Sequence, residues 1–518
     1  MPIKQVKNGV GRMVPTKING KPVIPFMGLG KHRPEGKIIG PSIPTCLDYP
    51  TDGNKTVPTL KDALIKSGLK DGMTISTHHH LRNGDLIVNK VFKIVNDLGI
   101  KDLVWFPSAS FPCHEPIIEY LENGTIHHIE GSMNGPLGRY TSQGKMKGVG
   151  ILRSHGGRVQ ALKDGEVKID IAVLAAPTCD KFGNANGQQG PSACGVLGYA
   201  KADVLFAEKV IIVTDNLVDF PCMPMEIEGN YVDHVVVVDR IGIPEKIVSG
   251  TTRITKNSDR LEIAELASHF LLESGILKDK CFVQAGAGGI SLAIGQYIHN
   301  ILIEKGWKIH LGFGGSTKYM VSMLEDGTME HIMDTQAFDL DAVRSIAENA
   351  NHHQYPVFNA YNFHSKGNLN SMMDLSILGA TEVDVNFNGN VVTHSDGYLL
   401  HGIGGWQNCL HAKNVILPLP LVRHGIPVIR DEVTTIVGPG ELIDVIVTTF
   451  GIAINPKRTD LLDKMKDSNL PIKTIEELKV EAERICGKPE KPEFIDKIVA
   501  AIKWVDGTVI DVVRQVKE

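Results

Sequence analysis

The segment Lys66-Ser-Gly-Leu-Lys-Asp71 recurs later in the chain as Glu273-Ser-Gly-Ile-Leu-Lys-Asp279, with an offset of 207 residues at the serine. A short apolar run follows each copy, Met73-Thr-Ile-Ser76 in the first and Cys281-Phe-Val-Gln284 in the second. A polar or glycine-rich loop comes next, and then a stretch with apolar residues at helical spacing. The same order of signals in both places indicates that one strand–helix unit is present twice.

A second pair of segments keeps nearly the same spacing more than a hundred residues further on. Asp180-Lys-Phe-Gly-Asn184 corresponds to Asn386-Phe-Asn-Gly-Asn390, with an offset of 206 residues at the final asparagine. Chance similarity between common strand and turn signals would not keep two landmarks in register over such a distance. We therefore predict a tandem duplication of two related domains, at residues 57–252 and 253–455. An irregular N-terminal segment (1–56) precedes them, and a helical tail with a terminal strand (456–518) follows.

Strands and helices alternate in both halves, which is the pattern of α/β domains with parallel-rich sheets. Apolar residues over 87–98 recur at helical spacing and stop before Gly99, which predicts a helix there. Because ligands of such sheets bind beyond the carboxyl ends of the strands, two related sheets would place those ends around a shared cleft. In the tail, Thr474-Ile-Glu-Glu477 has the form of a capping box for a helix that ends near Gly487, and residues 508–516 predict a strand.

Composition and charge narrow the class of protein. The net charge is −5, from 54 basic and 59 acidic residues, so no basic excess suggests a nucleic-acid partner. Hydrophobic residues make up 42% of the 518 residues, which is typical of a globular chain. No apolar run approaches the ~20 residues of a membrane span, and the N-terminus lacks the apolar core of a signal peptide. We expect a cytoplasmic protein without a membrane partner.

The histidines and cysteines do not have the spacing of a metal site. The eight cysteines include no C-x-x-C pair, and consecutive histidines such as His78-His79-His80 would point to opposite faces of a strand. We therefore predict neither a metal site nor a disulfide framework.

Three glycine-rich segments follow predicted strands in the second half. They are Gly286-Ala-Gly-Gly289, Leu311-Gly-Phe-Gly-Gly-Ser-Thr317 and Gly402-Ile-Gly-Gly-Trp406. Backbone without a Cβ atom at the start of a helix can hold an anion or a developing oxyanion. The first segment fits only part of a dinucleotide fingerprint, because its spacing is one residue too long and no acidic residue follows at the next strand end. The three segments together favour a binding site at one sheet edge. The spacing of the first segment argues against a nicotinamide cofactor as its ligand.

These segments carry a resemblance to a known superfamily. Val283–Gly289, Glu382–Asn390 and Gly402–Gly405 look like the second half of a CoA-transferase, and Asp180–Asn184 with the alanine-rich helix after it resembles the other half. Nearly the whole chain, including Thr77-His-His-His-Leu-Arg-Asn-Gly-Asp85, is similar to the alpha subunits of citrate lyase, which are citrate CoA-transferases. The resemblance implies two CoA-transferase-like α/β domains in tandem.

The resemblance also implies a reaction and partners. Alpha subunits of this family exchange acetate for citrate on the thioester of an acyl carrier protein, the gamma subunit, whose prosthetic group derives from dephospho-CoA. Free acetyl-CoA can replace the carrier, and a separate beta subunit cleaves the citryl thioester. The transfer step needs no cofactor bound by the alpha subunit itself.

One departure from other CoA-transferases concerns the mechanism. Many of them keep a catalytic glutamate just after the strand that matches Ile309-His-Leu311, whereas Gly312-Phe-Gly-Gly-Ser-Thr-Lys318 has no acid, and the next one along the chain is Glu325. A carboxylate that would take the acyl group and then hold CoA is therefore missing. We expect a citrate carboxylate to attack the acyl thioester directly, through a mixed anhydride. Glu382 or Asp396 is the alternative nucleophile.

The predicted site residues come from these segments and from the loop after the first strand. Backbone N–H groups should position the thioester and stabilise an oxyanion, from Gly288, Gly289, Gly404 and Gly405. The thioester or its pantetheine arm should contact Gly286, Ala287, Gly288, Gly289, Gly402, Ile403 and Gly404. Because citrate carries several negative charges, cationic and hydrogen-bonding side chains should bind it, namely His80, Arg82, Asn83, Asn184, Ser316 and Thr317.

Two alternative functions remain open on the sequence alone. A CoA-transferase or acyl-CoA hydrolase for small monocarboxylates would need only one carboxylate-binding group. A non-catalytic sensor of a sugar phosphate or an acyl-CoA would bind its ligand tightly without turnover.

Overall fold

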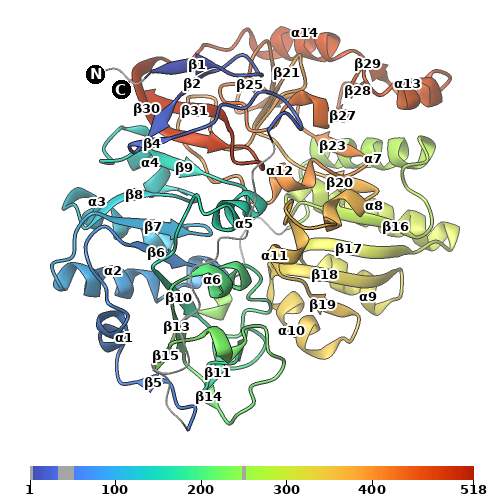
Figure 1. Cartoon of the computed structure of the whole chain (residues 1–518). Coiled ribbons are helices and arrows are strands. Elements are labelled where there is room, and N and C mark those ends of the chain that lie inside the picture. The colour runs from blue at the N-terminus through green and yellow to red at the C-terminus, as the bar shows by residue number, and fades with distance from the viewer. Residues whose placement is uncertain (1–3, 33–51, 248–252, 518) are drawn as a thin grey trace.

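The computed structural model describes residues 4–32, 52–247 and 253–517, which form two large sheets side by side with helices around them (Figure 1). Neighbouring strands of the first sheet are all parallel. Across this sheet the strands are β5 (Thr56–Val57), β15 (His234–Val237), β13 (Lys209–Thr214), β10 (Ile171–Ala175), β6 (Thr74–Thr77), β7 (Leu103–Pro107) and β8 (Ile126–Ile129).

The second sheet is parallel throughout its described strands, except where β28 runs antiparallel to β27. Across this sheet the strands are β19 (His352–Gln354), β18 (Met329–Ala337), β17 (Ile309–Ser316), β16 (Cys281–Ala285), β20 (Leu375–Ile377), β23 (Val415–Pro418), β27 (Val445–Thr448), β28 (Gly451–Ile454) and β29 (Ile472–Lys473). The α/β class with parallel-rich sheets is therefore confirmed.

The second sheet repeats the strand order of the first. From a central strand, β6 or β16, the chain adds strands on one side and then continues on the other side with β10 or β20. Equivalent hydrogen bonds tie these strands together, because the Thr74 N–H donates to Asp170 over 2.8 Å and the Phe282 N–H donates to Asp374 over 3.0 Å. The two halves thus share their hydrogen bonding as well as their strand order.

The second landmark of the repeat needs a correction of register. Asp180 ends β11 (Thr178–Asp180) and Asp384 ends β21 (Glu382–Asp384), and each accepts N–H groups of the turn that follows. Each also accepts the side-chain amide of an asparagine four residues later, Asn184 or Asn388. Our pairing of Asn184 with Asn390 is therefore wrong by two residues. The glycine that guided it precedes the asparagine in one turn and follows it in the other.

Helices lie around both sheets and stop where glycine permits. The predicted helix at 87–98 is α2 (Val88–Asp97), which buries Val91 and Val95. In the second half, α8 (Gly289–Lys305) ends at Gly306, whose φ of 66° is left-handed. The other helices of the first half are α1 (Leu60–Lys66), α3 (Ile117–Glu122), α4 (Pro136–Ser142), α5 (His155–Lys163) and α6 (Ala200–Phe206). Those of the second half are α7 (Ser258–Glu273), α9 (Lys318–Glu325), α10 (Leu340–Glu348), α11 (Val357–Ala360), α12 (Trp406–Cys409) and α13 (Thr459–Met465).

The C-terminal tail is partly helical and partly a sheet. The capping box at Thr474 starts α14 (Ile475–Cys486), which stops at Gly487, and the predicted terminal strand is β31 (Val509–Val516). The expectation of an otherwise helical tail is wrong, because β30 (Phe494–Lys503) pairs antiparallel with β31. β30 also pairs parallel with β9 (Gly150–Leu152) of the first half. Its apolar run is buried in this sheet, so packing overrides the helical preference of its two alanines.

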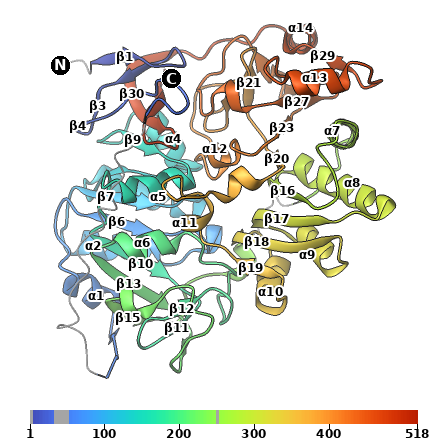
Figure 2. The same ribbon diagram turned by 45° about the vertical axis from the view of Figure 1, so that its right-hand side comes forward.

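The start of the described chain lies beside the same small sheet (Figure 2) and bridges to it at Pro25 and Val509. β1 (Gln5–Lys7) pairs with β2 (Met13–Pro15), and the Phe26 N–H donates to the Val509 carbonyl over 2.8 Å. The N-terminal segment therefore contains a short hairpin where we expected irregular chain, and residues 33–51 lie outside the described residues. Among the described residues, no helix is both long enough and apolar enough to cross a bilayer.

Candidate active site

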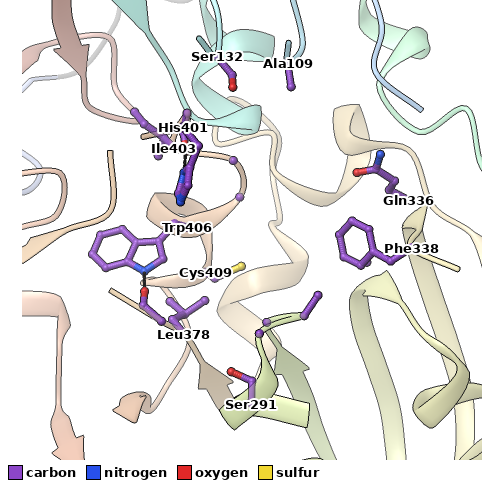
Figure 3. Close-up of a pocket in the computed structure, with 18 of the residues that line it drawn as sticks. Ala109, Ser132, Ser291, Gln336, Phe338, Leu378, His401, Ile403, Trp406 and Cys409 are labelled. Atoms are coloured by element: carbon purple, nitrogen blue, oxygen red, sulfur yellow. Dashed lines mark hydrogen bonds between the residues drawn. The ribbon is translucent and has the colours of Figure 1, made fainter. Parts of the chain in front are cut away.

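A cleft of about 980 Å³ is lined by residues at the carboxyl ends of strands from both sheets. The first half contributes Arg82, Phe111 and Asn134, which follow β6, β7 and β8. The second half contributes Gly286 after β16 and Gln336 near the end of β18. Figure 3 shows residues of the two halves around this space. The shared cleft expected from the sequence is present.

The segment Gly286–Gly289 lies on the cleft wall at the start of α8. Gly288 is the N-cap of this helix and offers no side chain to the first N–H groups, which have no partner inside the helix. Its φ of −73° suits any residue, and a Cβ atom built there has no heavy atom within 4 Å. The protein itself would therefore accommodate a side chain at Gly288, and such a side chain would occupy space in the cleft.

The segment Gly402–Gly405 also lines the cleft and is held by the first half of the chain. The Gly402 N–H donates to the Asn134 side chain over 3.1 Å, and the His155 N–H donates to the Gly404 carbonyl over 2.9 Å. A Cβ atom at Gly402 would overlap the Ser132 side chain, so the close approach of the two halves requires glycine here. This segment is thus placed by contacts between the domains.

The charge of the cleft is one-sided. Four cationic side chains line it, from Arg82, Lys246, Arg260 and Arg423, and no Asp or Glu of the described residues does. None of the four forms an ion pair with a carboxylate within the described part of the chain. Such a lining favours a ligand with several negative charges.

The guanidinium of Arg82 is largely buried. Its guanidinium lies over the Phe111 and Phe338 rings, 5.5 Å and 4.7 Å from their centroids, and two of its nitrogens are buried without a hydrogen-bond partner. Burial lowers the pKa of Arg82 to about 10, so the side chain remains charged at neutral pH. Its φ of 52° is uncommon for a residue with a side chain. A buried, unpaired guanidinium of this kind fits a carboxylate ligand.

A cluster of neutral polar side chains also lines the cleft, and we did not predict it from the sequence. His79 Nε2 lies 3.2 Å from Gln336 Oε1, which also accepts the Tyr199 hydroxyl over 3.2 Å. Tyr199 OH lies 3.2 Å from His155 Nε2. Burial lowers the pKa of His155 to about 3 and that of His79 well below its usual range, so both imidazoles are neutral at neutral pH. These residues come from four separate segments, which no local motif connects.

The structure does not bring every predicted citrate-binding residue to the cleft. Arg82 and Asn83 line it, as do all the glycine-segment residues that we assigned to the thioester. His80 instead faces the Ala175 carbonyl, and Asn184 binds Asp180 and the Gly229 N–H in its turn. These two residues are not among those that line the cleft.

Ser316 and Thr317 are also absent from the cleft lining. Ser316 is fully buried and donates to Asp334, and Thr317 precedes α9 with 2% of its surface exposed. The segment Gly312–Ser316, which we expected to be a loop, belongs to β17, so the strand runs five residues further than expected. Only Gly315 of this segment reaches the cleft.

The two alternative nucleophiles also lie outside the cleft lining. Glu382 is fully buried, where its carboxylate lies 2.9 Å from Arg430 Nη1 and accepts the Thr434 N–H over 2.9 Å. Asp396 accepts the Tyr398 N–H in an exposed turn on another face. Neither position suits attack on a thioester in the cleft.

Comparison with known proteins identifies what the chain is similar to. The sequence profile of the citrate lyase alpha subunit family matches residues 53–516. The citrate lyase alpha chain of Klebsiella pneumoniae is 42% identical over 465 residues, which cover 89% of this chain and 92% of that protein. The citrate lyase alpha chain of Haemophilus influenzae is 40% identical over 466 residues, which cover 90% and 93%.

Solved structures agree. The putative alpha subunit of citrate lyase from Streptococcus mutans, solved in complex with citrate, matches with a TM-score of 0.94 and 41% identity over 99% of this chain and 100% of that chain. The malonate decarboxylase alpha subunit of Acinetobacter baumannii matches with a TM-score of 0.60 and 15% identity over 83% and 88%. The second likeness concerns the fold alone.

Proposed function

Because the chain belongs to the family of citrate lyase alpha subunits, it is a citrate CoA-transferase, and we propose a direct mechanism for it. In this mechanism citrate itself attacks the acyl thioester, and no acyl-enzyme forms. The acyl donor would be the acetyl thioester of an acyl carrier protein, or acetyl-CoA in its place. The citryl thioester would then pass to a separate lyase subunit of the same complex.

The two chemical steps balance without water, a redox partner or an enzyme nucleophile. In the first, a citrate carboxylate oxygen attacks the acetyl thioester carbonyl, the C–S bond breaks, and a mixed anhydride and a thiolate form. In the second, the thiolate attacks the citryl carbonyl of the anhydride, and acetate leaves. Each step passes through a tetrahedral oxyanion.

The cleft offers what these steps need, namely charge for the acid and N–H groups for the oxyanion. Arg82 would bind a citrate carboxylate, because its guanidinium is buried and unpaired. The N–H groups at the start of α8 and those of Gly404 and Gly405 would stabilise the oxyanion. Positioning of two bound substrates would supply much of the remaining rate.

The observation that carries the proposal is the absence of any acidic side chain from the lining of the cleft, as far as the chain is described. A covalent enzyme–CoA thioester needs a carboxylate within reach of the acyl group, and none of the described lining residues provides one. The Cys409 thiol also lines the cleft, but burial raises its pKa to about 12, so it is not a thiolate at neutral pH. The four cations of the lining, none of which is ion-paired within the described residues, favour substrates that together carry several negative charges, as citrate and a nucleotide thioester do.

A panel of acceptor acids tests the substrate. With acetyl-CoA as donor, we expect citrate to give a citryl thioester at a kcat/KM at least about 10²-fold above that of propionate, because each lost charged hydrogen bond costs ~1.5–3 kcal/mol. Mass spectrometry of the thioester products measures this ratio. Equal use of propionate would favour a monocarboxylate transferase, and hydrolysis that does not depend on an acceptor would favour a hydrolase.

A further inference from the structure

Two arginines on separate segments of the second half line the cleft without a carboxylate partner. Arg260 lies in the first turn of α7 and is exposed, and Arg423 ends β24 (Val422–Arg423) and is half-buried. Within the described ranges, neither side chain forms an ion pair. The catalytic steps above assign no task to either residue.

Backbone contacts fix the Arg423 guanidinium at the cleft wall. Its Nη1 and Nη2 donate to the carbonyl oxygens of Thr381 and Ala380, over 3.3 Å and 3.0 Å. The two residues before these, Leu378 and Gly379, line the cleft, and the Trp406 indole N–H donates to the Gly379 carbonyl over 2.8 Å. Figure 3 shows this bond between Trp406 and the segment beside Leu378. Arg423 is therefore held in place without neutralisation of its charge.

Both positive charges line the same cleft. Burial lowers the pKa of Arg423, and the charge of Arg260 lowers it further. Glu382 opposes this shift, but it is already paired with Arg430. Two like charges that line one cleft favour a ligand with more than one negative charge.

Both arginines belong to segments that are hydrogen-bonded to the glycine segment Gly286–Gly289. The Thr255 N–H, just before α7, donates to the Gly289 carbonyl over 3.2 Å. The Gly286 N–H donates to the carbonyl of Ile377, which leads into the segment that holds Arg423. Arg82, by contrast, belongs to the first half of the chain.

We infer that Arg260 and Arg423 bind the pyrophosphate of the nucleotide arm that carries the acyl thioester. The inference rests on the proposed function and divides the cleft into two parts. The second half of the chain holds the phosphates, and the first half, at Arg82, holds the acid. A pyrophosphate offers two adjacent negative groups to two guanidinium groups, and it is present in both CoA and a prosthetic group derived from dephospho-CoA.

Three donors that share one thioester test the inference. Acetyl-CoA and acetyl-dephospho-CoA both carry the pyrophosphate, only the former carries the 3′-phosphate, and S-acetylpantetheine carries neither. With the full chain, we expect Arg260→Ala to raise the KM of the two nucleotide donors about tenfold, while kcat/KM with S-acetylpantetheine stays within about twofold. Arg423→Lys, which loses the carbonyl bonds, should raise the same two KM values by a similar factor.

Arg344→Ala is the matched control, because Arg344 is exposed on α10 and pairs with Glu325 and Glu348 away from the cleft. It should leave all three donors unchanged. A change of equal size with all three donors would overturn the inference, as would a change confined to acetyl-CoA, which would place the contact on the 3′-phosphate. If the wild type does not use citrate at all, the proposed function fails, and calorimetry with CoA against pantetheine then tests the two arginines independently of transfer.

Discussion

Replacement of Gly288 by valine is expected to lower kcat by at least about 10²-fold, because the side chain would push the thioester away from the N–H donors, and loss of one such donor costs ~10²–10³-fold. Nothing in the protein lies within 4 Å of a Cβ atom at this position, and the backbone there suits any residue. The folded protein therefore tolerates the added side chain, whereas the thioester or its arm would collide with it. Initial-rate measurements with acetyl-CoA and citrate test this, alongside a thermal melt.

Gly295→Val is the matched control for this variant. Gly295 lies in the same helix, α8, away from the cleft, and it also has no heavy atom within 4 Å of its Cβ position. We expect this variant to keep the wild-type rate, because valine is at least as well suited to a helix interior as glycine. Near-normal turnover by a properly folded Gly288→Val protein would refute the assignment of Gly288 to the thioester site.

Replacement of Arg82 by alanine is expected to raise the KM for citrate by about 10- to 100-fold, because a hydrogen bond to a charged group is worth ~1.5–3 kcal/mol. The KM for acetyl-CoA should change by no more than about twofold, since the inferred phosphate contacts lie on the other half of the chain. Arg82→Lys should give an intermediate citrate KM, because it restores the charge without the planar fork of donors.

Arg139→Ala controls for the loss of an arginine that lies over an aromatic ring. Arg139 is exposed on α4, with its guanidinium 5.1 Å from the Tyr398 ring centroid and outside the cleft. It should leave both KM values unchanged. Equal losses for citrate and acetyl-CoA in Arg82→Ala would instead assign Arg82 to the nucleotide or to the fold.

Much of the fold was predictable because its signals are local and occur twice. The serine–glycine segment at Ser67 and at Ser274 ends a helix in both halves, and the strand after it is a central strand of its sheet. The alignment of the turn after Asp180 with the turn after Asp384 was wrong by two residues, because a glycine can precede or follow the turn asparagine. β30 was missed because its alanines suit a helix, and its pairing with β31 and with the distant β9 makes it a strand.

The cleft was predictable where backbone forms it and much less so where side chains do. The glycine segments can be recognised in the sequence by their glycine content, and residues of all three line the cleft. Among three consecutive histidines, the sequence cannot tell which one faces a ligand, and the structure places His79 there and not His80. Arg260 and Arg423 carry no local motif, since only the folding of the second half brings them to one wall.

Direct transfer without an acyl-enzyme can be tested most simply by intact-mass analysis of the protein after incubation with acetyl-CoA. We predict an unchanged protein mass, no product of borohydride or hydroxylamine trapping, and initial-rate plots that intersect, as a ternary complex requires. A stoichiometric CoA adduct, above all one that maps to Glu382 or Asp396, together with parallel plots, would contradict direct attack by citrate.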